Sequence, residues 1–265
     1  LDQLLRNEAG AFAGDDPEFV HQARVAVRRL RSALRFWAPV LPEDFSAAWR
    51  PVWRDFAQRL GAARNLDVFA GEVLPPLLAA FPAHRGLRAL PAQIARQQAR
   101  ARREVRTALA APVSGRLVLE FSAALHALPD GKKRPTLAAF ARRRLRRLAR
   151  DVERRAAALA GAPETHHELR IAAKRLRYAL EFLAPLYPKK TLRRHLGRAA
   201  ALQEALGRLN DIHFAETFIA GRRGMTDVDL LRGWLAGQAT LLHEGLPAAL
   251  RAFLRSMRPW RQGGR

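Results

Sequence analysis

The stretch that decides the fold is "HQARVAVRRLRSALRFW", residues His21 to Trp37, because "HHELRIAAKRLRYALEFL", residues His166 to Leu183, repeats it. When position n is written over position n + 146, residues 21–42 and 167–188 are identical at 12 of 22 positions without a gap. The identical residues of the first copy are His21, Arg24, Ala26, Arg29, Leu30, Arg31, Ala33, Leu34, Phe36, Ala38, Pro39 and Pro42. The same offset aligns Leu60-Gly61 with Leu206-Gly207. A constant offset over this length indicates a duplicated structural unit.

Each copy predicts an amphipathic helix with a basic ridge beside its apolar stripe. At about 100° per residue, the basic side chains of each copy stack on one face. The first ridge contains His21, Arg24, Arg28, Arg31 and Arg35, and the second contains His167, Arg170, Lys174 and Arg177, with Glu181 at its last position. Arg29 and Arg175 lie beside the ridges, where they could instead reach a carboxylate such as Asp67 or Asp211.

The rest of the chain also predicts helices. Ala, Leu and Arg dominate, apolar residues recur at three-to-four spacing, and no stretch alternates like a strand. The proline-bearing and glycine-bearing breaks, among them residues 221–226, delimit about eight helices. The break from Leu128 to Pro135 resembles a linker near the middle of the chain. We therefore expect an all-α protein with two homologous four-helix bundles, residues 1–130 and 131–265, related by a pseudo-twofold axis.

Charge is the dominant feature of the composition. Lys and Arg total 47 against 24 acidic residues, which gives a net charge of +23 and a pI near 11.8. Such a field attracts polyanions over a long range. Only five of the basic residues are lysines, and the planar guanidinium of arginine binds phosphate oxygens in pairs, which a lysine cannot do. The composition therefore favours a polyanionic partner, either a phosphate polymer or a nucleic acid.

The composition also bears on the compartment. The chain has no cysteine, so disulfides and thiolate metal sites are excluded, and a reducing cytoplasm is a consistent location. No apolar run approaches the roughly 20 residues of a membrane span, and residues 1–20 lack the pattern of a signal peptide. We expect a soluble, cytoplasmic protein with no membrane partner.

Two interpretations of the ridges are open: an anion-binding surface or an ordinary solvated face. Solvated faces mix charges, because like charges four residues apart repel by a few tenths of a kcal/mol per pair. Five stacked basic side chains with no acidic side chain among them therefore favour an anion-binding surface. A third basic face lies within residues 140–159 and contains Arg143, Arg146, Arg147 and Arg150, with Arg154 at its end.

The histidine at the head of each ridge could bind a metal or a phosphate. Neither His21 nor His167 has a second ligand at i+4, and no His-Glu-x-x-His pattern occurs. An arginine follows each of them at i+3 and would repel a cation. These neighbours favour a hydrogen bond to phosphate, with protonation of the histidine promoted by the anion. We expect neither a metal site nor a cofactor.

At these residues the chain resembles the conserved histidine α-helical domain, CHAD. The resemblance rests on His21-x-x-Arg24-x-x-x-Arg28-Arg29-Leu30-Arg31, on its second version from His167 to Tyr178, and on the Leu-Gly…Asp pattern that follows. It covers essentially the whole chain. It implies two four-helix bundles about a pseudo-twofold axis, with a basic groove or pore between them that binds inorganic polyphosphate, often at polyphosphate granules. The sequence departs from the family pattern at Asn65, where an acid is expected, and in a short opening helix.

The expected function is non-catalytic binding of inorganic polyphosphate in the cytoplasm, with granules as a possible location. The predicted binding residues are His21, Arg24, Arg28, Arg29, Arg31, Arg35, Arg143, Arg146, Arg147, Arg150, His167, Arg170, Lys174, Arg175 and Arg177. Binding of nucleic acid is the first alternative, although no recognition-helix module is present. A polyphosphate-processing enzyme is the second, although the acidic residues are scattered and no phosphate-binding loop occurs. The sequence does not determine the oligomeric state or the preferred polyphosphate length.

Overall fold

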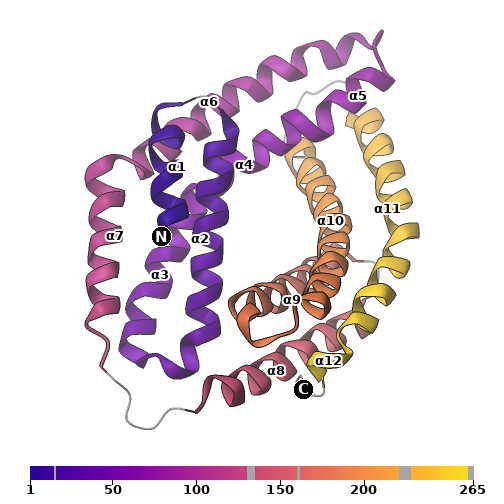
Figure 1. Cartoon of the computed structure of the whole chain (residues 1–265). Coiled ribbons are helices and arrows are strands. Elements are labelled where there is room, and N and C mark those ends of the chain that lie inside the picture. The colour runs from indigo at the N-terminus through magenta and orange to yellow at the C-terminus, as the bar shows by residue number, and fades with distance from the viewer. Residues whose placement is uncertain (15, 130–134, 160–161, 221–227, 262–265) are drawn as a thin grey trace. The chain divides into compact units, whose positions relative to one another are not determined.

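The protein is all helical in the part of the chain that the structure, a computed structural model, describes: residues 1–14, 16–129, 135–159, 162–220 and 228–261 (Figure 1). The α-helices are α1 (Asp2–Ala13), α2 (Pro17–Trp37), α3 (Glu43–Arg59), α4 (Gly61–Val68), α5 (Leu74–Ala80), α6 (Leu90–Ala108), α7 (Ala111–His126), α8 (Leu137–Ala157), α9 (Pro163–Phe182), α10 (Lys189–Ala220), α11 (Val228–Ser256) and α12 (Arg258–Arg261). Short 3₁₀ segments η1 (Ala38–Val40), η3 (Arg85–Ala89) and η4 (Ala184–Leu186) and a π-helical segment η2 (Phe69–Val73) connect some of them. The predicted all-α class is confirmed.

Contacts divide the chain into two compact units, Leu1–Arg134 and Pro135–Arg265. The domain boundary expected between residues 130 and 131 and the break expected at residues 221–226 lie outside the described residues.

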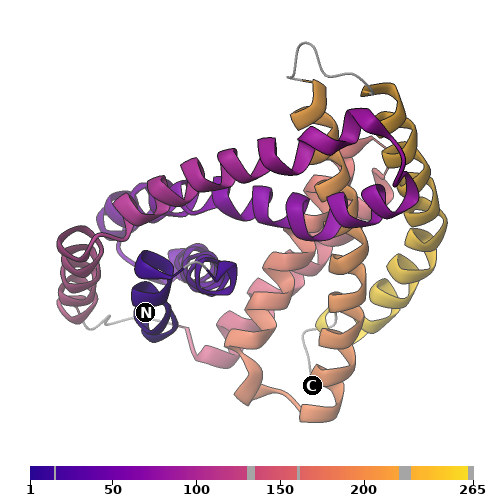
Figure 2. The ribbon, with the colours of Figure 1, turned by 90° about the horizontal axis from the view of Figure 1, so that it is seen from above.

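In the first unit, α2 is the central helix and packs against α1, α3 and α4 (Figures 1 and 2). Helix α6 closes the unit against α4, α1 and α3. Helix α7 contributes Phe121, whose ring packs against Trp49 and Trp53 of α3 at centroid distances of 5.0 and 5.3 Å. Because Trp53 and Phe121 are almost fully buried, they anchor α3 firmly. These rings therefore fix α7 against α3 in the core of the first unit.

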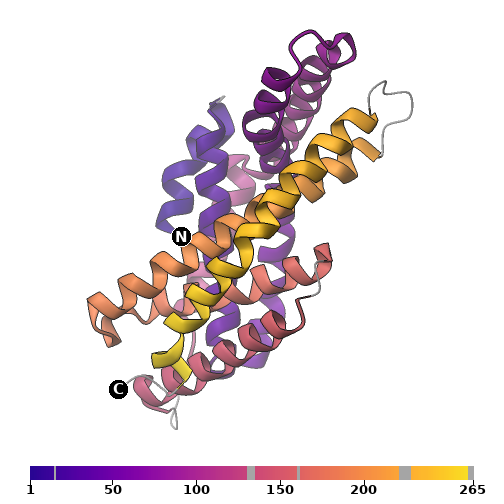
Figure 3. The same cartoon turned by 90° about the vertical axis from the view of Figure 1, so that its right-hand side faces the viewer.

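In the second unit, α9 lies between α8 and α10, and α10 runs beside α11 along most of its length (Figure 3). Helix α12 returns to α8, and its Trp260 packs edge-on against Tyr187 at 4.7 Å. Burying large aromatic side chains contributes about 1.5–3 kcal/mol each, so the short C-terminal helix is held in place by its tryptophan. The core of this unit consists mainly of Leu and Ala from α9 and α10.

The central helices of the two units begin at equivalent positions of the sequence repeat. Helix α2 begins at Pro17 and α9 at Pro163, η1 begins at Ala38 and η4 at Ala184, and α3 begins at Glu43 and α10 at Lys189. All three differences are 146, the offset of the sequence repeat. Proline suits the first turn of both ridge helices, because its missing amide would have no partner there.

The units differ after this common start. Helix α10 is continuous to Ala220, whereas the corresponding first-unit segment is divided among α3, α4, η2 and α5. Pro75 and Pro76 have no amide hydrogen, so the carbonyls four residues before them lose their helical donors. The π-helical turn that precedes them is closed by an i+5 bond from Leu74 to Phe69. These interruptions of the first-unit segment help to explain why the described residues form more helices than the roughly eight that the sequence predicted.

Candidate anion-binding surface

Helix α2 carries the first basic ridge. The helix begins where the Asp16 carboxylate accepts a hydrogen bond from the amide of Glu18 at 2.8 Å. His21, Arg24, Arg28 and Arg31 are partly buried, and Arg35 is exposed. Burial, the most important cause, and the nearby Arg64 lower the pKa of His21, while Glu18 raises it. The ridge therefore includes a neutral histidine whose protonation a bound anion would favour.

Helix α9 repeats this geometry at the head of its ridge. His167 is exposed, and its Nδ1 lies 3.2 Å from Oδ1 of Asn210 on α10. Asn210 is the residue 146 positions after Arg64. Each ridge histidine is therefore close to the same position of a following helix, but the neighbour is a cation in the first unit and a neutral amide in the second.

The ridges also differ at their ends. Arg177 donates from Nε to Glu181 at 2.9 Å and from Nη1 to Gln203 at 2.8 Å, and its guanidinium lies 5.5 Å from the ring centre of Tyr178. The first unit has Arg35 where the second has Glu181. The second ridge therefore ends in an internal ion pair, and the first ends in a further cation.

The third basic face lies on α8. Arg143, Arg146, Arg147 and Arg150 are all exposed. Two arginines that follow them pair with acids: Arg154 with Asp151, and Arg155 with Glu168 of α9. These two ion pairs therefore partly neutralise the charge of α8 near the end of the helix.

The residues beside the ridges are also resolved. Arg29 is exposed, and Arg175 is partly buried. Asp67, which the sequence offered as a partner for Arg29, accepts a hydrogen bond from Nε2 of Gln98 at 2.9 Å and lies 3.7 Å from Nη2 of Arg102. Side chains of α6 therefore hold this carboxylate, which is almost fully buried.

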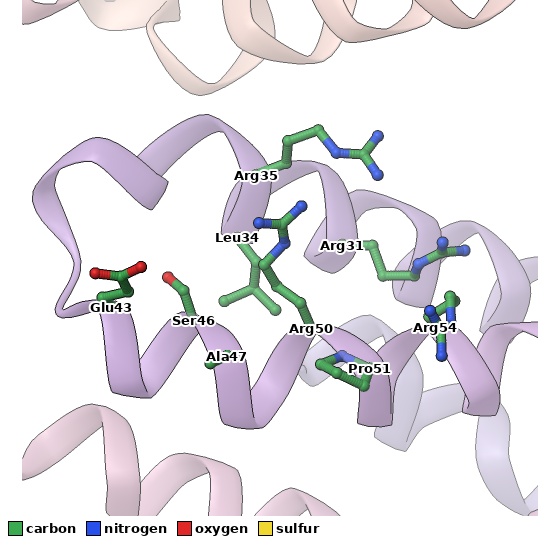
Figure 4. A pocket seen from close by; sticks show the side chains of 9 residues that line it. All are labelled: Arg31, Leu34, Arg35, Glu43, Ser46, Ala47, Arg50, Pro51 and Arg54. Atoms are coloured by element: carbon green, nitrogen blue, oxygen red, sulfur yellow. The ribbon is translucent and has the colours of Figure 1, made fainter.

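A hollow lined by four arginines lies between α2 and α3, and we call it the arginine hollow (Figure 4). It encloses about 420 Å³ and is lined by Arg31, Leu34, Arg35, Glu43, Ser46, Ala47, Arg50, Pro51 and Arg54. Arg31 and Arg35 come from α2, and Arg50 and Arg54 come from α3 (Figure 4). In both helices the pair has i,i+4 spacing, which places its two side chains on one face.

The electrostatics of the hollow favour an anion. Burial, the main cause, and the charge of Arg54 lower the pKa of Arg31, while Asp55 raises it. Burial and Arg54 therefore disfavour the charged form of Arg31, and a bound anion would favour it. The hydroxyl of Ser46 is buried and has no hydrogen-bond partner among the described groups. A buried donor without a partner costs about 1–3 kcal/mol, which a phosphate oxygen in the hollow could recover.

Comparison with known proteins identifies relatives of the chain by sequence and by fold. The family model described as "CHAD domain" matches residues 1–220. The solved CHAD domain from the plant Ricinus communis is 33% identical with a TM-score of 0.78, and the match covers 95% of this chain and 87% of that one. The chain belongs to the CHAD family. PptA from Streptomyces chartreusis is 16% identical with a TM-score of 0.70, and the match covers 97% of this chain and 94% of that one. At this identity, the similarity shows the fold alone. No curated protein matches the chain.

The basic surface of this CHAD domain includes residues that the sequence did not single out. Arg50 and Arg54 of the arginine hollow were missed, and so was Arg64 beside His21. Arg50 and Arg54 were visible as an i,i+4 pair, but only the packing of α3 on α2 shows that they face the first ridge. Arg64 aligns with Asn210 in the sequence repeat. This alignment points to Arg64 only after the structure has placed Asn210 beside His167.

Other histidines of the CHAD domain are buried within its second unit. His166 stacks on His243 of α11 at 4.9 Å, and burial and this neighbour lower its pKa. Burial lowers the pKa of His195 to about 4, and its Nδ1 lies 2.9 Å from Oγ of Ser256.

Within the described ranges, no group of three or more His, Cys, Asp or Glu side chains is arranged to hold a metal ion. No described helix is both long and apolar enough to cross a membrane.

Proposed function

We propose that this CHAD domain binds inorganic polyphosphate without cleaving it, through the basic side chains of the duplicated helices and of α8. The observation that carries the proposal is the doubled ridge. Helices α2 and α9 start at the same register, and each has a histidine at its head and basic residues along one face. A flexible phosphate polymer needs a row of closely spaced cations, which such a ridge supplies.

The arrangement of aromatic side chains supports polyphosphate over single-stranded nucleic acid. Proteins that bind single strands stack bases on exposed aromatic rings. In the first unit, Trp53 and Phe121 are nearly fully buried, and Phe45 contacts Phe121 at 5.9 Å. These three rings stabilise the core and are therefore not available to stack on bases, while the guanidinium groups of the ridges bind phosphate oxygens in pairs.

The surroundings of the acidic residues support binding without catalysis. Phosphoryl transfer requires carboxylates that hold divalent metal beside the phosphate. Glu181, the acid on the second ridge, is paired with Arg177, and Asp67 is held by side chains of α6. The test is to incubate the pure protein with polyphosphate and magnesium and to follow the polymer length on a gel. We expect an unchanged length, and progressive shortening would refute the non-catalytic part of the proposal.

In the cell, the proposed binding would bring the protein to polyphosphate granules in the cytoplasm. A fluorescent fusion should colocalise with a polyphosphate stain and disperse in cells that cannot make polyphosphate. An unchanged pattern in such cells would contradict granule association while leaving binding in solution to be judged separately.

Calorimetric titration with polyphosphates of graded length tests the binding itself. The affinity should rise with length until the polymer covers the full length of a ridge, because each added phosphate meets another cation. It should fall steeply with salt, since neutralised phosphates release their counterions. An affinity independent of length, or no binding by long chains at moderate salt, would overturn the proposal.

A further inference from the structure

Resting on the proposed function, we propose that the arginine hollow of the first unit binds the terminal phosphates of a polyphosphate chain, so that the domain holds one chain by its end. The part of the first ridge outside the hollow, from His21 to Arg28, would then bind the interior of the polymer. The inference begins with the shape and charge of the hollow.

The hollow is small, and its acidic residue lies at the end nearer the turn. Its volume of about 420 Å³ is near the lower limit of the roughly 300–1,000 Å³ that small-ligand sites enclose. Glu43 and Ser46 lie nearer the turn that joins α2 to α3, while Arg31 and Arg54 lie farther from it (Figure 4). The carboxylate of Glu43 repels phosphate at the turn side. A polymer can therefore place a short segment among the arginines but is not favoured to continue past Glu43.

The charge of the hollow suits the end of a chain better than its interior. Four arginines and one glutamate line it, and Arg54 is paired with Asp55 at 3.1 Å, so the hollow keeps a net positive charge. A terminal phosphate carries about −1.5 to −2 at pH 7 because its second pKa is about 6, whereas an internal phosphate has lost that group and carries about −1. The end of a chain therefore brings the greatest negative charge into a compact space.

The donors of the hollow fit the oxygens of a terminal phosphate. An end group has three non-bridging oxygens, one more than an internal phosphate. Guanidinium groups approach from two helices, and each can donate two parallel hydrogen bonds. The buried hydroxyl of Ser46, which has no partner among the described groups, adds a neutral donor. These donors provide for an extra oxygen that an internal phosphate lacks.

The second unit does not repeat this arrangement. At the positions of Arg31, Arg35, Arg50 and Arg54 it has Arg177, Glu181, Leu196 and Ala200. Arg177 is bonded to Glu181 and Gln203. The second unit has basic residues nearer its turn, Lys189 and Arg193, where the first has Glu43 and Ala47. The arrangement of four guanidinium groups is therefore specific to the first unit, and we expect one end-binding site per chain.

The test compares linear tripolyphosphate with cyclic trimetaphosphate, which has the same number of phosphorus atoms but no ends. Calorimetry should show one linear molecule bound per chain. The cyclic molecule should bind at least about tenfold more weakly. A tenfold difference corresponds to about 1.4 kcal/mol, which is less than the contribution of one charge-assisted hydrogen bond. The double variant Arg50→Gln/Arg54→Gln should bind tripolyphosphate about 100-fold more weakly, at about tenfold for each lost contact. It should also lose most of the preference for the linear form.

A matched control keeps the result specific. Arg251 and Arg255 of α11 have the same i,i+4 spacing and are exposed, so Arg251→Gln/Arg255→Gln removes the same charge elsewhere. This control should bind tripolyphosphate almost as the unchanged protein does. Ser46→Ala, which removes no charge, should weaken linear binding and spare cyclic binding. Circular dichroism of each variant should show unchanged helicity.

The outcomes separate this inference from the proposed function. Equal binding of the linear and cyclic forms, or equal losses in the two double variants, would overturn end binding. If long polyphosphate still binds in that case, the proposed function stands. Failure of long polyphosphate to bind the unchanged protein would overturn both.

Discussion

Replacing Arg28 and Arg31 of α2 together by glutamine should weaken polyphosphate binding strongly and leave the fold intact. Both side chains are partly buried on the ridge, away from Val27 and Leu34, which form the core face of the helix. Burial and Arg54 already lower the pKa of Arg31. Removing its charge therefore relieves repulsion, and the free energy of unfolding should stay the same or rise slightly.

The expected loss of affinity follows from the number of contacts removed. A hydrogen bond to a charged group contributes about 1.5–3 kcal/mol. Two such contacts contribute about 3–6 kcal/mol, and about 1.4 kcal/mol corresponds to a factor of ten. The dissociation constant should therefore rise by about 100-fold or more. The slope of log affinity against log salt should become shallower by about 1.4, at about 0.7 for each phosphate contact of a flexible single strand.

The assay is calorimetric titration with one long polyphosphate at several salt concentrations, with Arg251→Gln/Arg255→Gln as the control. The control removes two exposed arginines of the same spacing from α11 and should lower the affinity by less than about tenfold, since exposed, screened charges typically contribute about 0.5 kcal/mol each, or about 1 kcal/mol for the two. If both double variants lose affinity equally, diffuse charge and not the ridge holds the polymer, and the reasoning is refuted.

Three further predictions concern single side chains. Glu181→Gln should strengthen polyphosphate binding several-fold by releasing Arg177 from its partly buried ion pair, which we take to contribute about 1 kcal/mol; weaker binding in the same titration would contradict this. Polyphosphate should raise the pKa of His21 from its lowered value, so binding near pH 6 should take up a proton, seen as a buffer-dependent enthalpy that His21→Gln reduces. The folded-state pKa of His195 is about 4 against 6.5 when unfolded, so its contribution to stability is present above pH 6.5 and is lost as the pH falls towards 4. The loss is roughly 3 kcal/mol, and urea denaturation should show a weaker dependence on pH for His195→Gln.

The sequence predicted the ridge helices well because their pattern is periodic and repeated. The apolar stripe of the second copy is buried throughout, at Leu169, Ala172, Ala173, Leu176, Ala179, Leu180 and Leu183. In the first copy, Ala23, Ala26, Val27 and Leu34 are buried, whereas three other residues of the apolar stripe, Leu30, Ala33 and Trp37, are only partly buried. Phe36 is buried beside Trp37. Trp37 is the last residue of α2, where the chain turns into η1. Helical periodicity no longer determines which side chain faces the core there.

The sequence could not predict the arginine hollow, because the hollow depends on how two helices pack. Arg50 and Arg54 look like ordinary surface residues until α3 is placed against α2. The internal pairing of Arg177 with Glu181 was visible as an i,i+4 pair, but its link to Gln203 required the position of α10. Periodicity within one helix therefore identifies a face, and contacts between helices decide which residues share a site.

The most direct test of polyphosphate binding is a competition experiment. The protein is saturated with labelled long polyphosphate and titrated with duplex DNA and, separately, with unlabelled polyphosphate at equal phosphate concentration and fixed salt. We predict that unlabelled polyphosphate displaces the label, while DNA at the same phosphate concentration leaves most of it bound. Equal or better displacement by duplex DNA would show that the basic surface binds nucleic acid at least as well and would contradict the account.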